Sequence, residues 1–195
     1  MTVPQKTHLR PIKLEELDDL YKQRIESDFP SAERPPLAGL RYQYTAGLQD
    51  ILLLHTAERD VAYAVCAQEN GVALISLLAV FKEKRGGGCG TALLGRLKAH
   101  YGHLRAILIE VEDPARAANA ADRKTREKRI AFYQRAGYRF LEGIDHVCFG
   151  VPLLPMALAL TEPLQSVRKT AVRDLEALYR KILPKHLWGQ VVTRE

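Results

Sequence analysis

The sequence is short of the features that mark several large classes of protein. It has no apolar run of about eighteen residues, which argues against a membrane-spanning helix. Its start, MTVPQKTHLRPIKLEEL, lacks the apolar stretch of a secretory signal. Its three cysteines, Cys66, Cys89 and Cys148, are odd in number and widely spaced, which argues against a disulfide framework or a metal knuckle. We therefore expect a cytoplasmic protein with reduced thiols, no bound metal and no membrane partner.

The chain has more basic than acidic residues. The net charge of +6 favours an anionic partner, either nucleic acid or a phosphorylated cofactor. The basic residues are spread along the chain, however, and no nucleic-acid-binding motif is present. A nucleic-acid-binding protein is therefore the lowest-ranked interpretation.

Short apolar runs alternate with helical patterns along most of the chain. Asn70-Gly71, between two apolar runs, is a strong hairpin signal. Strands 71–80 and 105–113 flank a helix, so they are expected to be parallel neighbours. The predicted strands are 8–12, 50–57, 60–69, 71–80, 105–113 and a closing pair, 138–143 with 146–152. The predicted helices are 14–25, 40–47, 91–100 and 126–137.

Residues 161–195 differ from the rest. Thr161, Glu162 and Pro163 begin an amphipathic helix that Pro184 ends. Its apolar stripe consists of Leu164, Val167, Ala171, Leu175, Leu178, Tyr179 and Ile182. We predict a domain over 1–160 and a C-terminal helical extension over 161–195. The stripe packs either on that domain or on a second copy in a homodimer, and the sequence leaves both open.

The stretch KRGGGCGTALLGRL, residues 84–97, places four glycines in five positions between a buried strand and a helix. Bare backbone N–H groups and the positive end of the helix dipole make such a position an anion site. The phosphate-loop patterns GxxxxGK and GxGxxG do not match. The pattern [R/Q]-x-x-G-x-[G/A] does match, through Arg85, Gly88 and Gly90. The alternative is a turn that serves only to reverse the chain.

Several motifs carry a resemblance to a known superfamily. LLAVFKEKRGGGCGTALL, residues 77–94, resembles the coenzyme A-binding motif of the GCN5-related N-acetyltransferases (GNAT). RIAFYQRAGYRFL, residues 129–141, resembles the second signature of that superfamily. FPSAERPP, IEVEDP, FYQRAGY and PMALAL resemble motifs of a bacterial-type subgroup. Gly87, Cys89 and Arg126 depart from the residues that many relatives have at these positions.

The resemblance spans residues 8–160 and implies an α/β protein with the GNAT fold. That fold has a mixed, mostly antiparallel, twisted sheet of about six to seven strands with flanking helices. Its fourth and fifth strands are expected to be parallel and to splay apart. The C-terminal helix lies outside this pattern.

The resemblance also implies a function, the direct transfer of an acetyl group from acetyl-CoA, the co-substrate, to a primary amine. The pantetheine arm of the coenzyme lies between the splayed strands, and the Val80 amide meets the acetyl carbonyl. Tyr133, in the FY of the second signature, is expected to protonate the departing thiolate. The alternative is that Tyr133 only packs in the core, beside Ile130 and Phe132. The implied coenzyme-binding residues are Leu78, Ala79, Val80, Arg85, Gly86, Gly87, Gly88, Cys89, Gly90 and Thr91.

The strand ILIEVED carries two carboxylates that are candidate catalytic groups even without the resemblance. Glu110 and Glu112 share one face of this strand. A carboxylate on a largely apolar strand is costly unless it meets water, a partner or a substrate. One of the two is therefore a candidate to accept the proton of the amine. The alternative is a salt bridge to Arg126, Lys128 or Arg129, and the sequence leaves both open.

The acceptor amine is not indicated by the sequence, because the predicted loops 28–49 and 113–125 carry no recognisable signature. A small molecule and a protein both remain open as the partner. A catalytically silent regulatory module that binds coenzyme A is the alternative function.

Overall fold

The computed structural model describes residues 6–31 and 33–195. Residues 1–5 of the predicted domain, and the alanine within FPSAERPP, lie outside the described residues. The chain forms two compact units. The first comprises the described residues up to Ala67 together with Ile75–His100, and the second comprises Gln68–Leu74 and Tyr101–Glu195.

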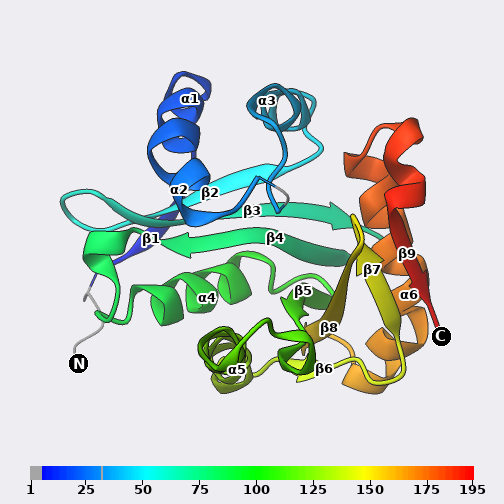
Figure 1. Ribbon diagram of the computed structural model, residues 1–195. Helices are drawn as coiled ribbons and strands as arrows, with labels where there is room; N and C mark the ends of the chain where they lie inside the picture. The colour runs from blue at the N-terminus through cyan, green and yellow to red at the C-terminus, as the bar shows by residue number, and fades with distance from the viewer. Residues whose placement is uncertain (1–5, 32) are drawn as a thin grey trace. The chain divides into compact units, whose positions relative to one another are not determined.

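The first unit contains the N-terminal strands and the glycine-rich segment. Its strands β1, β2 and β3 pair antiparallel in that order, with Arg10 opposite Leu53 and Leu53 opposite Tyr63. In Figure 1 the early helices lie over one face of these strands and α4 over the other. The strands are β1 (His8–Pro11), β2 (Asp50–His55), β3 (Asp60–Glu69) and β4 (Val72–Val80), the last two of which also enter the second unit. The helical elements are η1 (Leu14–Glu16), α1 (Leu17–Leu20), a π-helical turn (Tyr21–Ile25), α2 (Glu26–Asp28), α3 (Leu37–Thr45), η3 (Lys82–Lys84) and α4 (Cys89–His100).

Apolar side chains from both the strands and the early helices form the core of this unit. Leu17 and Ile25 from the helical turns pack with Leu53, Tyr63 and other buried residues of the strands. The predicted helix over 40–47 begins three residues earlier, directly after Pro36, whose ring favours the entry to a helix. The predicted helix over 91–100 also begins earlier, at Cys89.

The second unit is built around β5, the strand that carries the two glutamates. Val72, Ala73 and Leu74 of β4 pair parallel with Ala106, Ile107 and Leu108, which confirms the predicted parallel neighbours. On its other side β5 pairs antiparallel with β8. The elements are β5 (Ala106–Glu112), η4 (Pro114–Arg116), α5 (Ala120–Arg135), β6 (Arg139–Phe140), β7 (Asp145–Cys148), β8 (Val151–Ala159), α6 (Leu164–Ile182), η5 (Lys185–Gln190) and β9 (Val191–Arg194).

The strands form a mixed, mostly antiparallel sheet, as predicted. Their hydrogen-bonded order is β1-β2-β3-β4-β5-β8-β7-β9, and β6 pairs with β8. The described residues hold nine strands, more than expected, because β8 and the C-terminal β9 add to the predicted set. The splaying of β4 and β5 stays a prediction.

Two predicted elements of the second unit are wrong in position. Of the predicted closing pair, 138–143 contains the short β6, which pairs with β8, whereas 146–152 spans the hairpin turn between β7 and β8 at Phe149 and Gly150, with φ of +49° and +78°. Helix α5 begins at Ala120 instead of 126, because Asn119 Oδ1 accepts a hydrogen bond from the Asp122 amide at 2.9 Å and caps the helix. Residues 120–125 lack apolar periodicity, so the sequence pattern did not predict the first turns of α5.

Two predicted turns are confirmed. Asn70 and Gly71 have φ of +51° and +73°, the left-handed values of a tight hairpin turn. Gly137 has a φ of +99° and follows the end of α5, as expected of a helix C-terminus.

The C-terminal residues pack within the second unit of their own chain. Helix α6 packs against β8 and β9, and β9 pairs antiparallel with β7. The α6 residue Asp174 is buried and binds Arg105 Nη2 at 2.5 Å, Thr170 Oγ1 at 2.7 Å and Arg173 Nη2 at 2.9 Å. The division of the chain at residue 160 stays a prediction.

The described residues contain no helix that combines the length and the apolar character needed to cross a membrane.

We expect Asp174→Asn to lower the free energy of unfolding by about 2 kcal/mol, because the partly buried guanidinium of Arg105 loses the nearer of its two carboxylate partners and keeps only Glu162 at 3.5 Å. The matched control is Glu176→Gln on the same helix, where an exposed pair with Arg180 should contribute less than about 0.5 kcal/mol. Urea unfolding at pH 7 measures both. Equal losses in the two variants would contradict the assigned role of Asp174.

Candidate active site

The glycine-rich segment of the first unit is a turn between the end of β4 and the start of α4. Gly86 and Gly88 both have a φ of +79°, which side chains of L-residues rarely tolerate. A Cβ at Gly86 would find no described atom within 4 Å. Backbone conformation, not crowding, therefore selects glycine at this position. The predicted alternative of a chain-reversing turn accounts for Gly86 without any ligand.

The same turn is also suited to an anion. The first amides of α4 have no partner within the helix, and the helix dipole is positive at this end. Arg85, Gly86 and Gly87 are exposed. The one acidic residue of the segment, Glu83, is paired with Arg24 at 2.8 Å, and this pairing lowers the pKa of Glu83. The Arg85 amide donates to the Lys82 carbonyl at 3.4 Å, whereas the helix N-terminus that follows and the excess of positive charge fit a diphosphate group.

Arg85 is held in place by groups that the sequence pattern did not reveal. Its Nη2 lies 2.8 Å from Oδ1 of Asp28, and its Nε donates to the Val80 carbonyl at 3.0 Å. The Asp28 side chain is only 3% exposed and also accepts a hydrogen bond from the Tyr63 hydroxyl at 3.2 Å. Burial, together with the nearby Asp28, raises the pKa of Tyr63. The charge of Arg85 is thus already balanced in part by Asp28.

The remaining predicted coenzyme-binding residues lie beside this turn. Ala79 is buried in the core, whereas Leu78 and Val80 are half-buried on the opposite face of β4. The Cys89 side chain is buried at the start of α4.

Tyr133 lies on α5 in the second unit. Its side chain is 9% exposed, and its ring contacts those of Phe132 and Tyr138, with centroids 5.2 and 5.6 Å away. Burial, opposed in part by the positive charge of Arg129, raises the pKa of Tyr133 to about 12. The hydroxyl therefore keeps its proton throughout the neutral range.

The two candidate glutamates on β5 have different partners. Glu112 Oε1 lies 3.4 Å from Nη2 of Arg126, and its Oε2 contacts Nη1 of Arg129. This is the salt bridge that the sequence left open as an alternative, formed with two of the three predicted cations. Glu112 therefore has a structural partner of opposite charge.

Glu110 instead meets a cluster of uncharged or titratable groups. Its Oε2 accepts a hydrogen bond from the Tyr179 hydroxyl at 2.5 Å. Its Oε1 lies 2.7 Å from Nε2 of His146, although neither atom makes a well-aligned hydrogen bond within the described residues. Cys148 Sγ donates to the Tyr179 oxygen at 3.4 Å, and Thr193 Oγ1 lies 2.8 Å from His146 Nδ1.

Burial dominates the acid–base properties of this cluster. It raises the pKa of Tyr179 well above its usual value, and the negative charge of Glu110 acts in the same direction. It raises the pKa of Cys148 to about 12. Sequence reasoning had placed Tyr179 only in an apolar stripe and had given His146 no role. The polar His146 within a short strand was the available signal.

The predicted site residues divide between the two units. All predicted coenzyme-binding residues, from Leu78 to Thr91, lie in the first unit. Tyr133, Glu110 and Glu112 all lie in the second.

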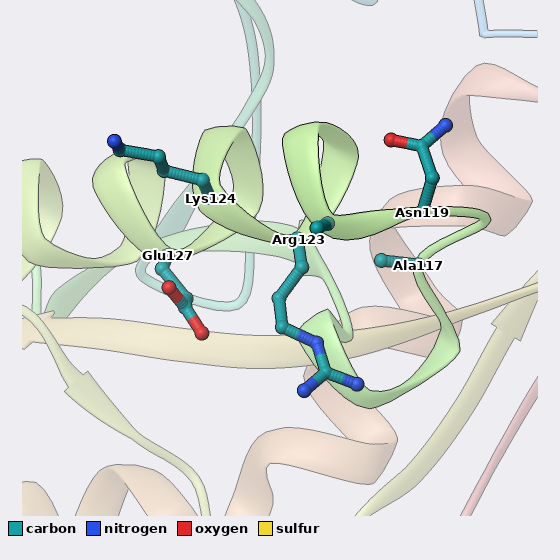
Figure 2. Close-up of a pocket in the computed structure, with 6 residues that line it drawn as sticks. Ala117, Asn119, Arg123, Lys124 and Glu127 are labelled. Carbon is teal, nitrogen blue, oxygen red and sulfur yellow. The ribbon is translucent and has the colours of Figure 1, made fainter.

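A shallow hollow lies beside the first turns of α5. It is lined by Ala117, Asn119, Ala120, Arg123, Lys124 and Glu127. Figure 2 shows that Arg123 and Glu127 extend to one side of the helix, while Lys124 and Asn119 extend to the other. The two cations do not converge on one point. Within the described residues, no group of three histidine, cysteine or acidic side chains is arranged to hold a metal ion.

Comparison with solved structures identifies the architecture. A chain from Bacteroides thetaiotaomicron assigned to the GNAT acetyltransferase family matches with a TM-score of 0.71 and 20% identity, over 87% of this chain and 96% of that one. The ribosomal-protein-S18-alanine N-acetyltransferase from Escherichia coli matches with a TM-score of 0.56 and 18% identity, over 81% and 96% of the two chains. Mutant forms of the spermidine/spermine N-acetyltransferase from Vibrio cholerae match with 0.57 and 15%, over 85% and 99%.

The chain has the GNAT fold. Its parallel β4 and β5 and its flanking helices are those expected of this fold. No protein-family model matches the sequence, and no curated protein matches it. The likeness thus rests on the three-dimensional arrangement of the GNAT fold.

We expect Gly86→Ala to lower the free energy of unfolding by about 1 kcal/mol, because alanine is strained in a left-handed conformation. Gly87→Ala is the matched control, since Gly87 lacks a positive φ and a Cβ there would lie at an ordinary 3.6 Å from the Lys84 carbonyl oxygen. It should be neutral or stabilising by up to about 1 kcal/mol. Urea unfolding of the two variants measures the difference, and similar losses would contradict the strained turn.

Proposed function

We propose that this chain is an acetyl-CoA-dependent N-acetyltransferase that acts on a primary amine, with residues 1–160 as its acetyltransferase domain. One observation carries the proposal: a turn with two left-handed glycines, exposed at Gly86, leads directly into the N-terminus of α4, in a chain with the GNAT fold. A turn that only reverses the chain has no need of an excess of positive charge around a helix N-terminus.

The first unit binds the coenzyme in this proposal. The amides from Arg85 to Thr91 hold the diphosphate, and the glycines keep side chains away from those amides. Leu78, Ala79 and Val80 offer main-chain groups to the pantetheine arm. The Val80 amide is a fixed donor for the acetyl carbonyl, where negative charge develops during the reaction.

The second unit moves the protons. Acetyl-CoA supplies the acetyl group as a thioester, so a C–N bond to the amine forms and the C–S bond breaks. Tyr133 donates its hydroxyl proton toward the sulfur. Burial raises the pKa of Tyr133 to about 12, so its hydroxyl holds a proton for transfer throughout the neutral range. Solvent then restores the tyrosine proton.

Glu110 is the proposed acceptor of the amine proton. The ion pairs of Glu112 with Arg126 and Arg129 favour a structural role for that residue. Glu110 keeps about 10% of its side-chain surface exposed and has no arginine or lysine among its described partners. The N–H bond of the amine breaks, an O–H bond forms on the carboxylate, directly or through one water, and the proton then leaves to solvent.

The acceptor is a primary amine on a small molecule or on a protein. Two of the matching structures are named for such acceptors, one for spermidine and spermine and one for the alanine of a ribosomal protein. Both kinds of amine belong in the first acceptor screen. A catalytically silent module that binds coenzyme A is the second candidate, since the glycine turn and the helix N-terminus would serve binding alone.

Calorimetry with coenzyme A, followed by thiol release from acetyl-CoA with spermidine and with an alanine-terminated peptide, tests the proposal. We expect Tyr133→Phe to bind coenzyme A as the wild type does but to lower kcat by about 100-fold, because the proton donor is lost. Tyr101→Phe, at a buried tyrosine outside the proposed site, is the matched control and should retain the rate. Coenzyme binding without thiol release would favour the silent module, and no binding would contradict both candidates.

We expect Glu110→Gln to abolish the acid limb of kcat/KM against pH and to lower the rate by about 100-fold, because the amide cannot accept the proton. The matched variant Glu112→Gln should keep that limb at the wild-type pH, whatever its effect on the rate. Rates measured from pH 5 to pH 9 compare the two. A limb that disappears with Glu112→Gln instead would reverse the assignment.

A further inference from the structure

The surroundings of Glu110 come partly from the C-terminal residues. Four elements meet at this carboxylate cluster: β5 with Glu110, β7 with His146 and Cys148, α6 with Tyr179, and β9 with Thr193. Two of these elements lie beyond residue 160, in the predicted C-terminal extension. That extension therefore supplies part of the environment of the proposed proton acceptor.

We propose that Tyr179 is a positioning residue, which holds the Glu110 carboxylate in the orientation in which it can take the amine proton. The inference rests on the proposed function and deepens it. Tyr179 touches neither the reacting carbonyl nor the amine in this account, and it acts only through Glu110.

The direction of the hydrogen bonds supports this role. Cys148 Sγ donates to the Tyr179 oxygen at 3.4 Å, which leaves the tyrosine proton for Glu110 Oε2 at 2.5 Å. Burial raises the pKa of both Cys148 and Tyr179, so both remain protonated and keep donating in the neutral range. A carboxylate withdrawn from water needs such donors to stay ionised.

The imidazole of His146 completes the arrangement from the other side. His146 is 0% exposed, and its Nε2 lies 2.7 Å from Glu110 Oε1. Its ring stacks on that of Tyr179 with centroids 5.8 Å apart, and Thr193 Oγ1 lies 2.8 Å from its Nδ1. The Tyr179 ring and the Thr193 hydroxyl thus both constrain the His146 ring beside the carboxylate.

Glu110 is faced by few titratable groups within the described residues. His146 and Cys148 face it from β7, and Tyr179 faces it from α6. Its register partner on β8 is Pro155, which does not titrate. Among these groups, the Tyr179 hydroxyl is the one that donates a hydrogen bond to Glu110. Its removal should therefore be visible in the pH dependence of the reaction.

The test is Tyr179→Phe in the full-length protein, which removes only the hydroxyl. The ionised form of Glu110 loses a stabilising donor, so a higher pH is needed to ionise it. We expect the acid limb of kcat/KM to move up by about one pH unit, with a rate about tenfold lower below the limb and recovery above it. The probes are acetyl-CoA with spermidine and with an alanine-terminated peptide.

Thr170→Val is the matched control. It removes a hydroxyl that donates to the buried carboxylate of Asp174 on the same helix, at 2.7 Å. Its loss of stability should be comparable, but the limb should stay at the wild-type pH. If Tyr179→Phe fails to fold, Thr193→Val, which frees the His146 ring, must move the same limb.

The outcomes separate the two proposals. A wild type that turns over an amine, with a limb that neither Tyr179→Phe nor Thr193→Val moves, overturns the positioning role alone. A wild type that binds coenzyme A but turns over neither amine overturns the proposed function and this inference together. A limb that moves equally in Thr170→Val shows a general loss of packing and also overturns the inference.

Discussion

The structure of the second unit depends on one constraint, that a carboxylate removed from water must find donors. Glu110, Glu112 and Asp174 are all partly or wholly buried, and each is matched differently. Glu112 takes two arginines from α5, Asp174 takes arginines and a hydroxyl, and Glu110 takes the Tyr179 hydroxyl and lies beside His146. Because several of these donors come from α6, and β9 supplies the Thr193 hydroxyl beside His146, the C-terminal residues belong structurally to the unit that holds the proposed proton acceptor.

The first unit is organised by a different constraint, the conformation of the main chain around the glycines. Two left-handed residues, Gly86 and Gly88, allow the chain to turn between β4 and α4 and to enter the helix at Cys89. Helix geometry then provides positive potential without any specific side chain. Asp28 and the Val80 carbonyl hold the side chain of Arg85 at the start of this turn.

Much of the fold was predictable because its signals are local. The Asn70-Gly71 turn, the parallel strands on either side of α4 and the end of α5 at Gly137 follow from neighbouring residues. The errors lie where local signals are weak. Helix α5 begins in a polar segment, where the cap at Asn119 decides instead of apolar periodicity, and β8 was missed because its partner β5 is distant in sequence.

By itself the sequence determined the glycine turn, the order of the core strands and the pair of glutamates on one strand, because each depends on residue type and short spacing. Only the tertiary structure decided which glutamate meets arginines and which meets Tyr179 and His146. It also decided that the apolar stripe of α6 packs within its own chain. The physical reason is that the packing of segments distant in sequence decides which groups meet a buried charge. A local sequence pattern alone is compatible with several such partners.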